Sequence, residues 1–482
     1  SQELSRILVK FPVTTGDDSV NSIQAKRNSG DIPASGNVSF FLKMYNVAHH
    51  ESLPVAAKLN IFGVSSASWE EGRGVDLDTY SDRTLNGIGA NWVNASNTET
   101  WPTPGGTYHT GSDNKNLLYS QTLPNGNEDI ELNISALVEE WIAGTKSNYG
   151  LGIFLTSSQE AYFSSSTGQN LPATSGGLLH NIAGTTTSFY TKKFSARSSE
   201  YFFKRPLIEA RWDSAKKDDR SNFYYSSSIA TPLENLNTIY FYNYFRGRLR
   251  NLPGVGTGNV AVSIFSGSAD DTTIGTGSAL TLAIGGGVLS ATRTVITGAY
   301  VSKGIYSASF ALTAAATPLK TIYDVWHLGP GAPGAVQYHT GTIKPKKNFG
   351  SNIAPDTTYV SKITNLRKTY RNDENARFRL YTRLKNWSPT IYTKAKNAPE
   401  INIIESGSYE IHRVIDDLKV VPYGTGSSLH TQMSFDASGS YFDLDMHMLE
   451  SGYMYGIKMS FYNESVSAWV EQPHIFKFRV EK

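Results

Sequence analysis

The sequence predicts an all-β protein built from three antiparallel β-sandwich domains in tandem. Three observations lead to this prediction. Apolar residues alternate with polar ones along much of the chain, which is the pattern of a strand with one face in a core. Clusters of Gly, Asn, Ser and Pro separate these runs at the spacing of hairpins. The length of 482 residues, at ~150 residues per domain, suggests about three separate cores.

The alternating runs extend from one end of the chain to the other. Near the N-terminus, Ile7, Val9, Phe11 and Val13 share one face of an expected strand, and Arg6 falls on the opposite face. Similar runs are expected to form strands at residues 40–45, 260–264, 306–312, 376–380 and 476–480.

A single segment is expected to be helical. Between Ser135, which can cap a helix, and Gly144, which can end it, apolar residues recur at spacings of three and four. Because no such segment separates the other strands, a parallel α/β sheet with crossover helices is disfavoured.

Two changes of composition mark the expected domain boundaries. The segment Asp213–Arg220 is rich in charged residues and is expected to be a solvated linker. Ile343–Pro355 is a second candidate, because its prolines interrupt strand pairing. The expected domains are therefore residues 1–213, 221–345 and 350–482. The first is predicted to be jelly-roll-like with one short helix, and the second and third immunoglobulin-like.

Composition narrows the classes of function. Lys and Arg number 44 against 42 Asp and Glu, so the formal net charge of +2 indicates neither a nucleic-acid partner nor a membrane surface. The absence of cysteine excludes thiolate nucleophiles and Cys-ligated metals. The first residues lack a basic region followed by an apolar core, and no stretch reaches ~20 apolar residues, so neither a signal peptide nor a transmembrane segment is expected.

Known catalytic signatures are missing from the sequence. There is no Gly-x-Ser-x-Gly elbow and no His-Glu-x-x-His pair. Asp324 and His327 are spaced so that an orienting hydrogen bond is conceivable, but without a nucleophile such a pair is more often structural. The sequence therefore predicts no catalytic residues, no cofactor and no enzyme activity.

An acidic, Gly-broken loop is a weak candidate for a calcium site, because carboxylate oxygens are the ligands that hard cations prefer. Its acidic residues are Glu70, Glu71, Asp76, Asp78 and Asp82. The helix–loop–helix calcium pattern is not met, so an ordinary hydrogen-bonded loop is the favoured interpretation and no metal is predicted.

Two further groups are candidates for binding. Trp92, Trp101 and Tyr108 are interleaved with Asn and Thr, as on a sugar-binding platform, although Trp in β-sandwiches is more often part of the core. Alternation also places Arg377, Arg379 and Arg383 on one face of a strand. That face is expected either to be solvated or to contact an acidic partner.

Several motifs of the first domain occur in a characteristic order. They are Ile7–Phe11, Val38–Tyr45, Ser68–Gly74, Leu132–Gly144, Asn148–Leu155, Phe194–Arg197 and Lys204–Arg211. In these motifs the domain resembles the DNRLRE family, a β-sandwich module of bacterial surface and secreted proteins related to some alginate-binding modules. The chain departs from the family in a Ser-, Thr- and Gly-rich insertion between Phe163 and Phe189. The resemblance implies a sandwich fold and a possible glycan ligand.

The whole chain, including Thr238–Tyr242, Thr321–His327 and Tyr441–Asp445, resembles uncharacterised virion proteins of marine contractile-tailed phages. This resemblance implies a non-enzymatic structural protein, made in the host cytoplasm and present in several copies on the neck, tail or head exterior of the virion. Its partners are expected to be other virion proteins and further copies of itself, as a homo-oligomer or symmetric ring. The alternative is a carbohydrate-binding adhesin that recognises host or matrix polysaccharide.

Overall fold

The computed structural model describes residues 5–50, 53, 55–66, 68–71, 89–109, 117–162, 183–186, 192–284, 291–313, 318–329, 336–347, 358–391 and 401–482. The chain divides into two compact units, Ser1–Asp213 and Ser214–Lys482. The described residues form many short strands and two short α-helices, which confirms the all-β prediction. The first unit ends at the first expected boundary, and the second unit contains both other expected domains.

The first unit is a sandwich of two antiparallel sheets. One sheet has the order β1-β6-β3-β4 and the other the order β5-β2-β7. The strands are β1 (Ile7–Val9), β2 (Ser39–Met44), β3 (Ala57–Gly63), β4 (Leu118–Leu123), β5 (Ile130–Asn133), β6 (Leu151–Leu155) and β7 (Leu207–Arg211). Phe40 and Leu42 of β2 and Leu59 and Ile61 of β3 belong to one buried apolar core, as the alternating pattern requires.

Helix α2 (Ser135–Ala143) confirms the helical prediction, and Gly144 ends it with a φ of +73°. Ser135 is the first helical residue rather than the cap. Its hydroxyl accepts from the Phe40 N–H at 2.8 Å and donates to Asn133 Oδ1 at 2.6 Å, which ties the helix to the sheet.

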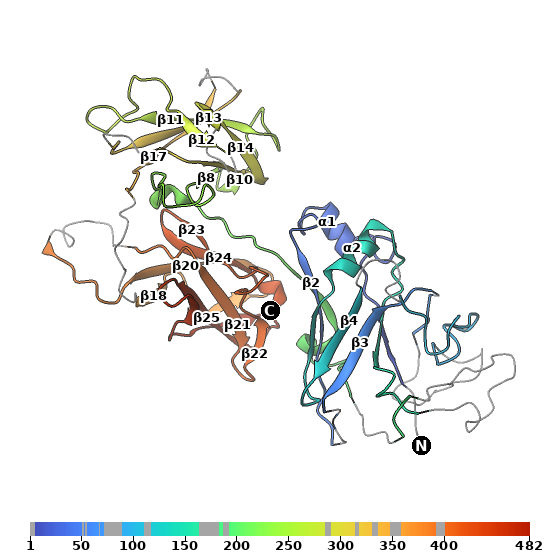
Figure 1. Ribbon diagram of the computed structural model, residues 1–482. Helices are drawn as coiled ribbons and strands as arrows, with labels where there is room; N and C mark the ends of the chain where they lie inside the picture. The colour runs from blue at the N-terminus through green and yellow to red at the C-terminus, as the bar shows by residue number, and fades with distance from the viewer. Residues whose placement is uncertain are drawn as a thin grey trace. The chain divides into compact units, whose positions relative to one another are not determined.

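The expectation of a single helix in this domain was wrong, because α1 (Ile23–Asn28) is also present. With six residues it is too short to show a helical period. Helices α1 and α2 lie side by side (Figure 1) and are joined by a bidentate ion pair between Arg27 and Glu139, with both N–O distances 2.7 Å. No helix in the described part of the chain has the length and hydrophobicity needed to cross a bilayer.

The second unit begins with what we call the middle sandwich, residues 221–347. Its main sheet has the order β17-β16-β11-β14-β15-β8, and the pairs β12-β13 and β9-β10 are separate. The strands are β8 (Asn237–Tyr242), β9 (Tyr244–Phe245), β10 (Arg248–Leu249), β11 (Val260–Ser266), β12 (Leu282–Ile284), β13 (Ala291–Arg293), β14 (Val295–Ser302), β15 (Ile305–Phe310), β16 (Ile322–His327) and β17 (Gln337–Ile343). The largest fully buried side chains of its core are Trp326, Tyr306, Phe223 and Phe310.

The C-terminal sandwich, residues 358–482, has the sheets β18-β20-β24-β23 and β19-β27-β25-β21-β22, with β26 also paired to β25. The strands are β18 (Tyr359–Ile363), β19 (Thr369–Arg371), β20 (Asn375–Leu384), β21 (Gly407–Arg413), β22 (Leu418–Val421), β23 (Ser434–Asp436), β24 (Gly439–Asp445), β25 (Met454–Asn463), β26 (Ala468–Glu471) and β27 (Phe476–Glu481). Aromatic rings join the two sheets. Phe442 of β24 stacks on Tyr409 of β21 with centroids 4.0 Å apart.

The segment expected to be a solvated linker is instead bound to the C-terminal sandwich, so that prediction was wrong. The Phe435 N–H donates to the Lys216 carbonyl at 3.0 Å, and the Asp218 N–H donates to the Phe435 carbonyl at 3.1 Å. The segment thus pairs in parallel with the edge strand β23 through Lys217 and Phe435. Asp218 is only 4% exposed. A segment rich in charged residues can still pack against a domain when its main chain forms hydrogen bonds with an unpaired edge strand.

Candidate functional site: an interaction surface

The three aromatic residues of the expected sugar platform do not form an open stacking surface. Trp101 is 5% exposed and belongs to a small buried cluster. Trp92 and Tyr108 are half-buried, and the guanidinium of Arg6 lies 4.8 Å and 5.8 Å from the centroids of their rings. Glu160 holds that guanidinium through two hydrogen bonds of 3.0 Å. The rings therefore pack around an internal ion pair.

Only part of the calcium candidate can be placed. Glu71 forms an ion pair with Arg197 at 2.9 Å, and Glu70 accepts from the Asn97 N–H at 3.3 Å. The other three candidates lie outside the described residues; they are Asp76, Asp78 and Asp82. Among the described residues, no three His, Asp or Glu side chains gather closely enough to hold a metal ion.

The arginines of β20 lie on one face of the strand, as the alternation predicted. Arg377 forms a bidentate pair with Asp443 at 2.8 and 3.0 Å, and these hydrogen bonds raise the pKa of Arg377. Arg379 forms a similar pair with Asp436 at 2.9 and 2.8 Å. Arg383 lies 5.8 Å from the centroid of the Trp387 ring. Two of the three charges are neutralised on the same sheet, so the expected positive stripe is largely cancelled.

Asp324 and His327 do not form the conceivable orienting pair, because residues three apart on a strand lie on opposite faces. Asp324 is fully buried and binds Arg220. Nε2 of His327 lies 3.0 Å from Oγ of Ser263 on β11, and burial lowers the pKa of His327. Both members of this Ser–His pair are 0% exposed, so no substrate can reach them.

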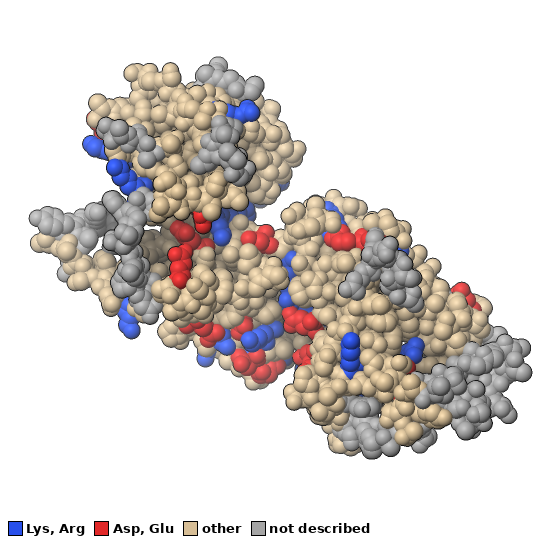
Figure 2. Space-filling model, in the orientation of Figure 1, with Lys and Arg blue, Asp and Glu red and all other residues tan. Residues whose placement is uncertain are grey.

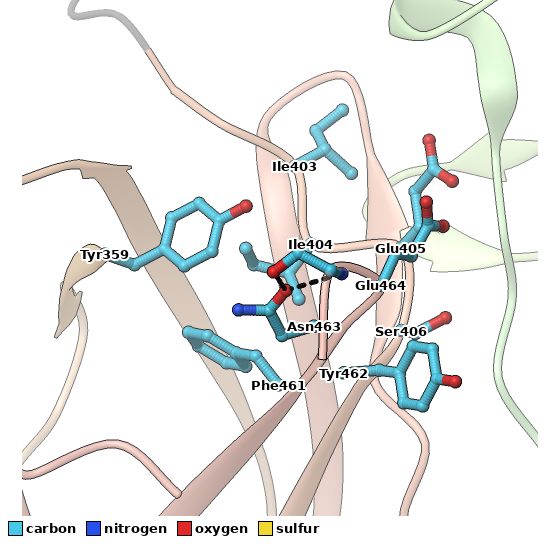
Figure 3. A pocket seen from close by; sticks show the side chains of 10 residues that line it. Tyr359, Ile403, Ile404, Glu405, Ser406, Phe461, Tyr462, Asn463 and Glu464 are labelled. Carbon is cyan, nitrogen blue, oxygen red and sulfur yellow. Dashed lines mark hydrogen bonds between the residues drawn. The ribbon is translucent and has the colours of Figure 1, made fainter. Parts of the chain in front are cut away.

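A depression in the C-terminal sandwich, of about 290 Å³, is drawn in Figure 3. Tyr359, Phe461 and the carboxylates of Glu405 and Glu464 line it. Asn463 turns back onto its own loop, where its Oδ1 accepts two hydrogen bonds from Ser465 at 2.9 and 2.7 Å. The volume lies just below the range of about 300–1,000 Å³ for small-molecule sites. At least one polar group of the depression, Oδ1 of Asn463, already forms hydrogen bonds within the protein.

The most distinctive exposed feature is the hairpin of β9 and β10, residues 244–250, which we call the arginine hairpin. Tyr244 pairs with Leu249, and Phe245 pairs with Arg248. The two turn residues, Arg246 and Gly247, have φ values of +50° and +75°. Two successive residues with positive φ define the tight type I′ turn that suits the twist of a hairpin.

The arginine hairpin presents aromatic rings and cations together. Tyr244 and Phe245 are 56% and 52% exposed. The guanidinium groups of Arg246 and Arg250 each lie 5.3 Å from the centroid of the Phe245 ring. Neither of them, nor Arg248, forms an ion pair with any carboxylate in the described part of the chain. The surface is thus strongly positive and partly apolar.

The base of the hairpin is held by main-chain and amide hydrogen bonds. Nδ2 of Asn243 donates to the Arg250 carbonyl at 2.6 Å, and the Asn243 N–H donates to the Gly304 carbonyl at 2.8 Å. Gly304 has a φ of +73°, and a Cβ there would lie 2.7 Å from the Arg250 nitrogen. Only glycine allows this close approach, which orients the hairpin on the β14–β15 turn.

Sequence analysis did not single out this hairpin, although two signals mark it. No Asp or Glu occurs between Glu234 and Asp270, and within that stretch an Arg-Gly-Arg turn follows an aromatic pair. A search for local charge rather than net charge would have found it.

Comparison with known proteins adds little to this description. No family model and no curated protein matches the chain. Among solved structures, it is similar to the fibronectin(III)-like modules of CbhA from Clostridium thermocellum, with 11% identity over 56% of this chain and 92% of that chain and a TM-score of 0.15. A marsupial T cell receptor matches with 8% identity over 51% of this chain and 69% of that chain and a TM-score of 0.16. Trypsin-activated α2-macroglobulin from Escherichia coli matches with 10% identity over 89% of this chain and 29% of that chain, also at 0.16. Structural similarity at TM-scores this low gives no information about the function of the chain.

Proposed function

We propose that the chain is a non-enzymatic structural protein of a tailed-phage virion that acts through protein–protein contacts. The observation that carries the proposal is the arginine hairpin, where Tyr244 and Phe245 are exposed beside three arginines that have no carboxylate partner among the described residues. Tyr and Arg are enriched among the residues that dominate binding energy at protein interfaces.

The use of ionisable groups elsewhere in the molecule agrees with a structural role. Internal ion pairs join separate segments of the chain. Arg220 pairs with Asp324, and Arg379 pairs with Asp436. A group that stabilises a fold in this way is not available to transfer protons to a substrate. These charges therefore stabilise the fold.

The virion setting rests on the resemblance of the whole chain, including the segments that form β8, β16 and β24, to virion proteins of contractile-tailed phages. In this proposal the protein occupies the neck, tail or head exterior in several copies and contacts neighbouring virion proteins.

Quantitative mass spectrometry of purified particles tests the proposal. The chain is expected at a copy number of at least several per particle, together with the known structural proteins of the same sample. Its absence from particles, despite abundant production in the infected host, would contradict the proposal.

A further inference from the structure

We propose that the arginine hairpin docks into an acidic surface of a partner protein, where carboxylates surround an apolar pocket that accepts Phe245. The inference deepens the proposed function and rests on it for the class of partner.

The charge of the hairpin selects a partner with carboxylates. Arg246, Arg248 and Arg250 lie within five residues of one another, and the planar guanidinium group can form two parallel hydrogen bonds with one carboxylate. Elsewhere in the second unit such pairs are made internally, as between Arg377 and Asp443. At the hairpin no carboxylate of the described residues forms such a pair, so the three guanidinium groups are available to carboxylates of another molecule.

The exposed aromatic rings of the hairpin favour a partner that offers an apolar pocket over one that offers only a flat charged surface. Phe245 is 52% exposed, yet two guanidinium groups lie 5.3 Å from its ring. Burying an aromatic side chain between desolvated charge pairs is the arrangement of an interface hot spot. Tyr244, which is 56% exposed, adds contact area at its side.

The backbone of the turn supports a binding role. Arg246 has a φ of +50°, a conformation that costs a non-glycine residue roughly 1–2 kcal/mol. Asn or Asp is the favoured residue at this turn position. Arg246 thus occupies a position that Asn or Asp would take at a lower conformational cost, and a role of its guanidinium in binding accounts for an arginine there.

A protein partner is favoured over a nucleic acid or another long polyanion. Polyanion-binding surfaces carry extended areas of positive charge, whereas this chain has a net charge of only +2. On the face shown in Figure 2, Lys and Arg are interspersed with Asp and Glu. The positive charge of the hairpin is therefore confined to its three arginines. The carboxylates of a single acidic pocket suffice to neutralise it.

The test measures binding of the isolated full chain to three defined probes at physiological salt. They are a random copolymer of glutamate and tyrosine, a single-stranded DNA oligonucleotide and a polyuronate. The copolymer is expected to bind best, and Arg248→Glu and Phe245→Ser are each expected to weaken that binding by about tenfold. Lys320→Glu, which makes the same charge change at a side chain that is 83% exposed in the same unit, is the matched control and should bind normally.

Three results would overturn the proposal. They are no saturable binding of the copolymer, equal or stronger binding of either polyanion, and self-association of the chain that Phe245→Ser abolishes, which would assign the surface to a second copy. Unchanged unfolding curves establish that the variants fold. Because the isolated chain is used, failure here leaves the particle measurement of the proposed function unaffected.

Discussion

Arg220 and Asp324 form a bidentate ion pair, at 2.5 and 2.8 Å, across 104 residues of chain. Asp324 also accepts from Nε1 of Trp326 at 2.7 Å and is 0% exposed. Gly341 pairs with Asp324 on the neighbouring strand, and a Cβ at Gly341 would lie 2.3 Å from Nη1 of Arg220. The pair connects the segment after Asp213 to the centre of the middle sandwich.

Breaking this pair should destabilise the second unit strongly. In Arg220→Met the Asp324 carboxylate stays buried without its cation, which costs about 3–5 kcal/mol in comparable sites. Urea unfolding followed by tryptophan fluorescence measures the loss. Arg371→Met is the control, because Arg371 and Asp373 form a pair that is 70% and 54% exposed, and it should cost less than about 1 kcal/mol. Equal losses would contradict the assigned importance of the buried pair.

A methyl group at position 341 should have a similar effect without removing any charge. Gly341→Ala places its Cβ within contact of both members of the pair, so the ion pair or the strand must shift. We expect a loss of about 1–3 kcal/mol, as for other overpacked sites. Gly277→Ala is the control, since a Cβ at Gly277 meets nothing within 4 Å. A neutral Gly341→Ala variant would show that the strands accommodate the added group.

Ionisation of Asp218 and Asp219 should lower the stability of the second unit as the pH rises from about 4 to about 7. The histidines of the unit whose pKa values are lowered by desolvation contribute in the opposite direction; they are His327, His339 and His412. Burial raises the pKa of Asp218 from 3.8 to about 6 and that of Asp219 to about 7. At these two carboxyls the folded state binds more protons than the unfolded state in this range, so their contribution to the free energy of unfolding falls as they ionise. Urea unfolding at intervals between pH 4 and pH 8 measures the slope.

Asp219→Asn should flatten part of that slope. The amide oxygen can still accept from the Thr238 N–H, which lies 2.7 Å from Oδ2 of Asp219, but it cannot ionise. At pH 8 we expect the variant to be about 1–3 kcal/mol more stable than the parent, with the two curves converging below pH 4. Glu464→Gln removes an exposed carboxylate of the same unit and should leave the slope intact. A steeper slope in Asp219→Asn would contradict the assignment.

Trp101 should behave as a core residue of the first unit. Trp101→Ala removes a side chain that is 5% exposed and is expected to cost about 3–5 kcal/mol. Thermal unfolding of the full chain measures this loss. Tyr201→Ala, at a side chain that is 57% exposed, should change little. Glycan binding lost in Trp101→Ala with full stability would instead revive the sugar platform.

The parts of the fold that depend on local pattern could be predicted. Strands such as Asn375–Leu384 and Phe476–Glu481 follow period two, and Gly144 ends its helix as the sequence indicated. Helix α1 was missed because six residues show no period. Alternation also placed Arg377 and Arg379 correctly on one face.

The properties of the candidate sites could not be predicted, because they depend on partners that are distant in sequence. Arg377 is neutralised by Asp443, which is 66 residues away, and Arg6 meets Glu160 across 154 residues. Whether an aromatic ring or a charge is free is decided by such pairings. In the arginine hairpin, by contrast, the turn and the charged residues all lie within residues 244–250, so the sequence itself shows both.

The parallel pairing of Lys217 with Phe435 has a mechanical consequence. Tension that travels along the chain from Asp213 reaches the hydrogen bonds between Lys216, Asp218 and β23 before it reaches β8. A pull on the first unit is therefore resisted first by the C-terminal sandwich, although the middle sandwich follows next in sequence. When the load is anchored in the C-terminal sandwich, the middle sandwich carries it only after these hydrogen bonds break.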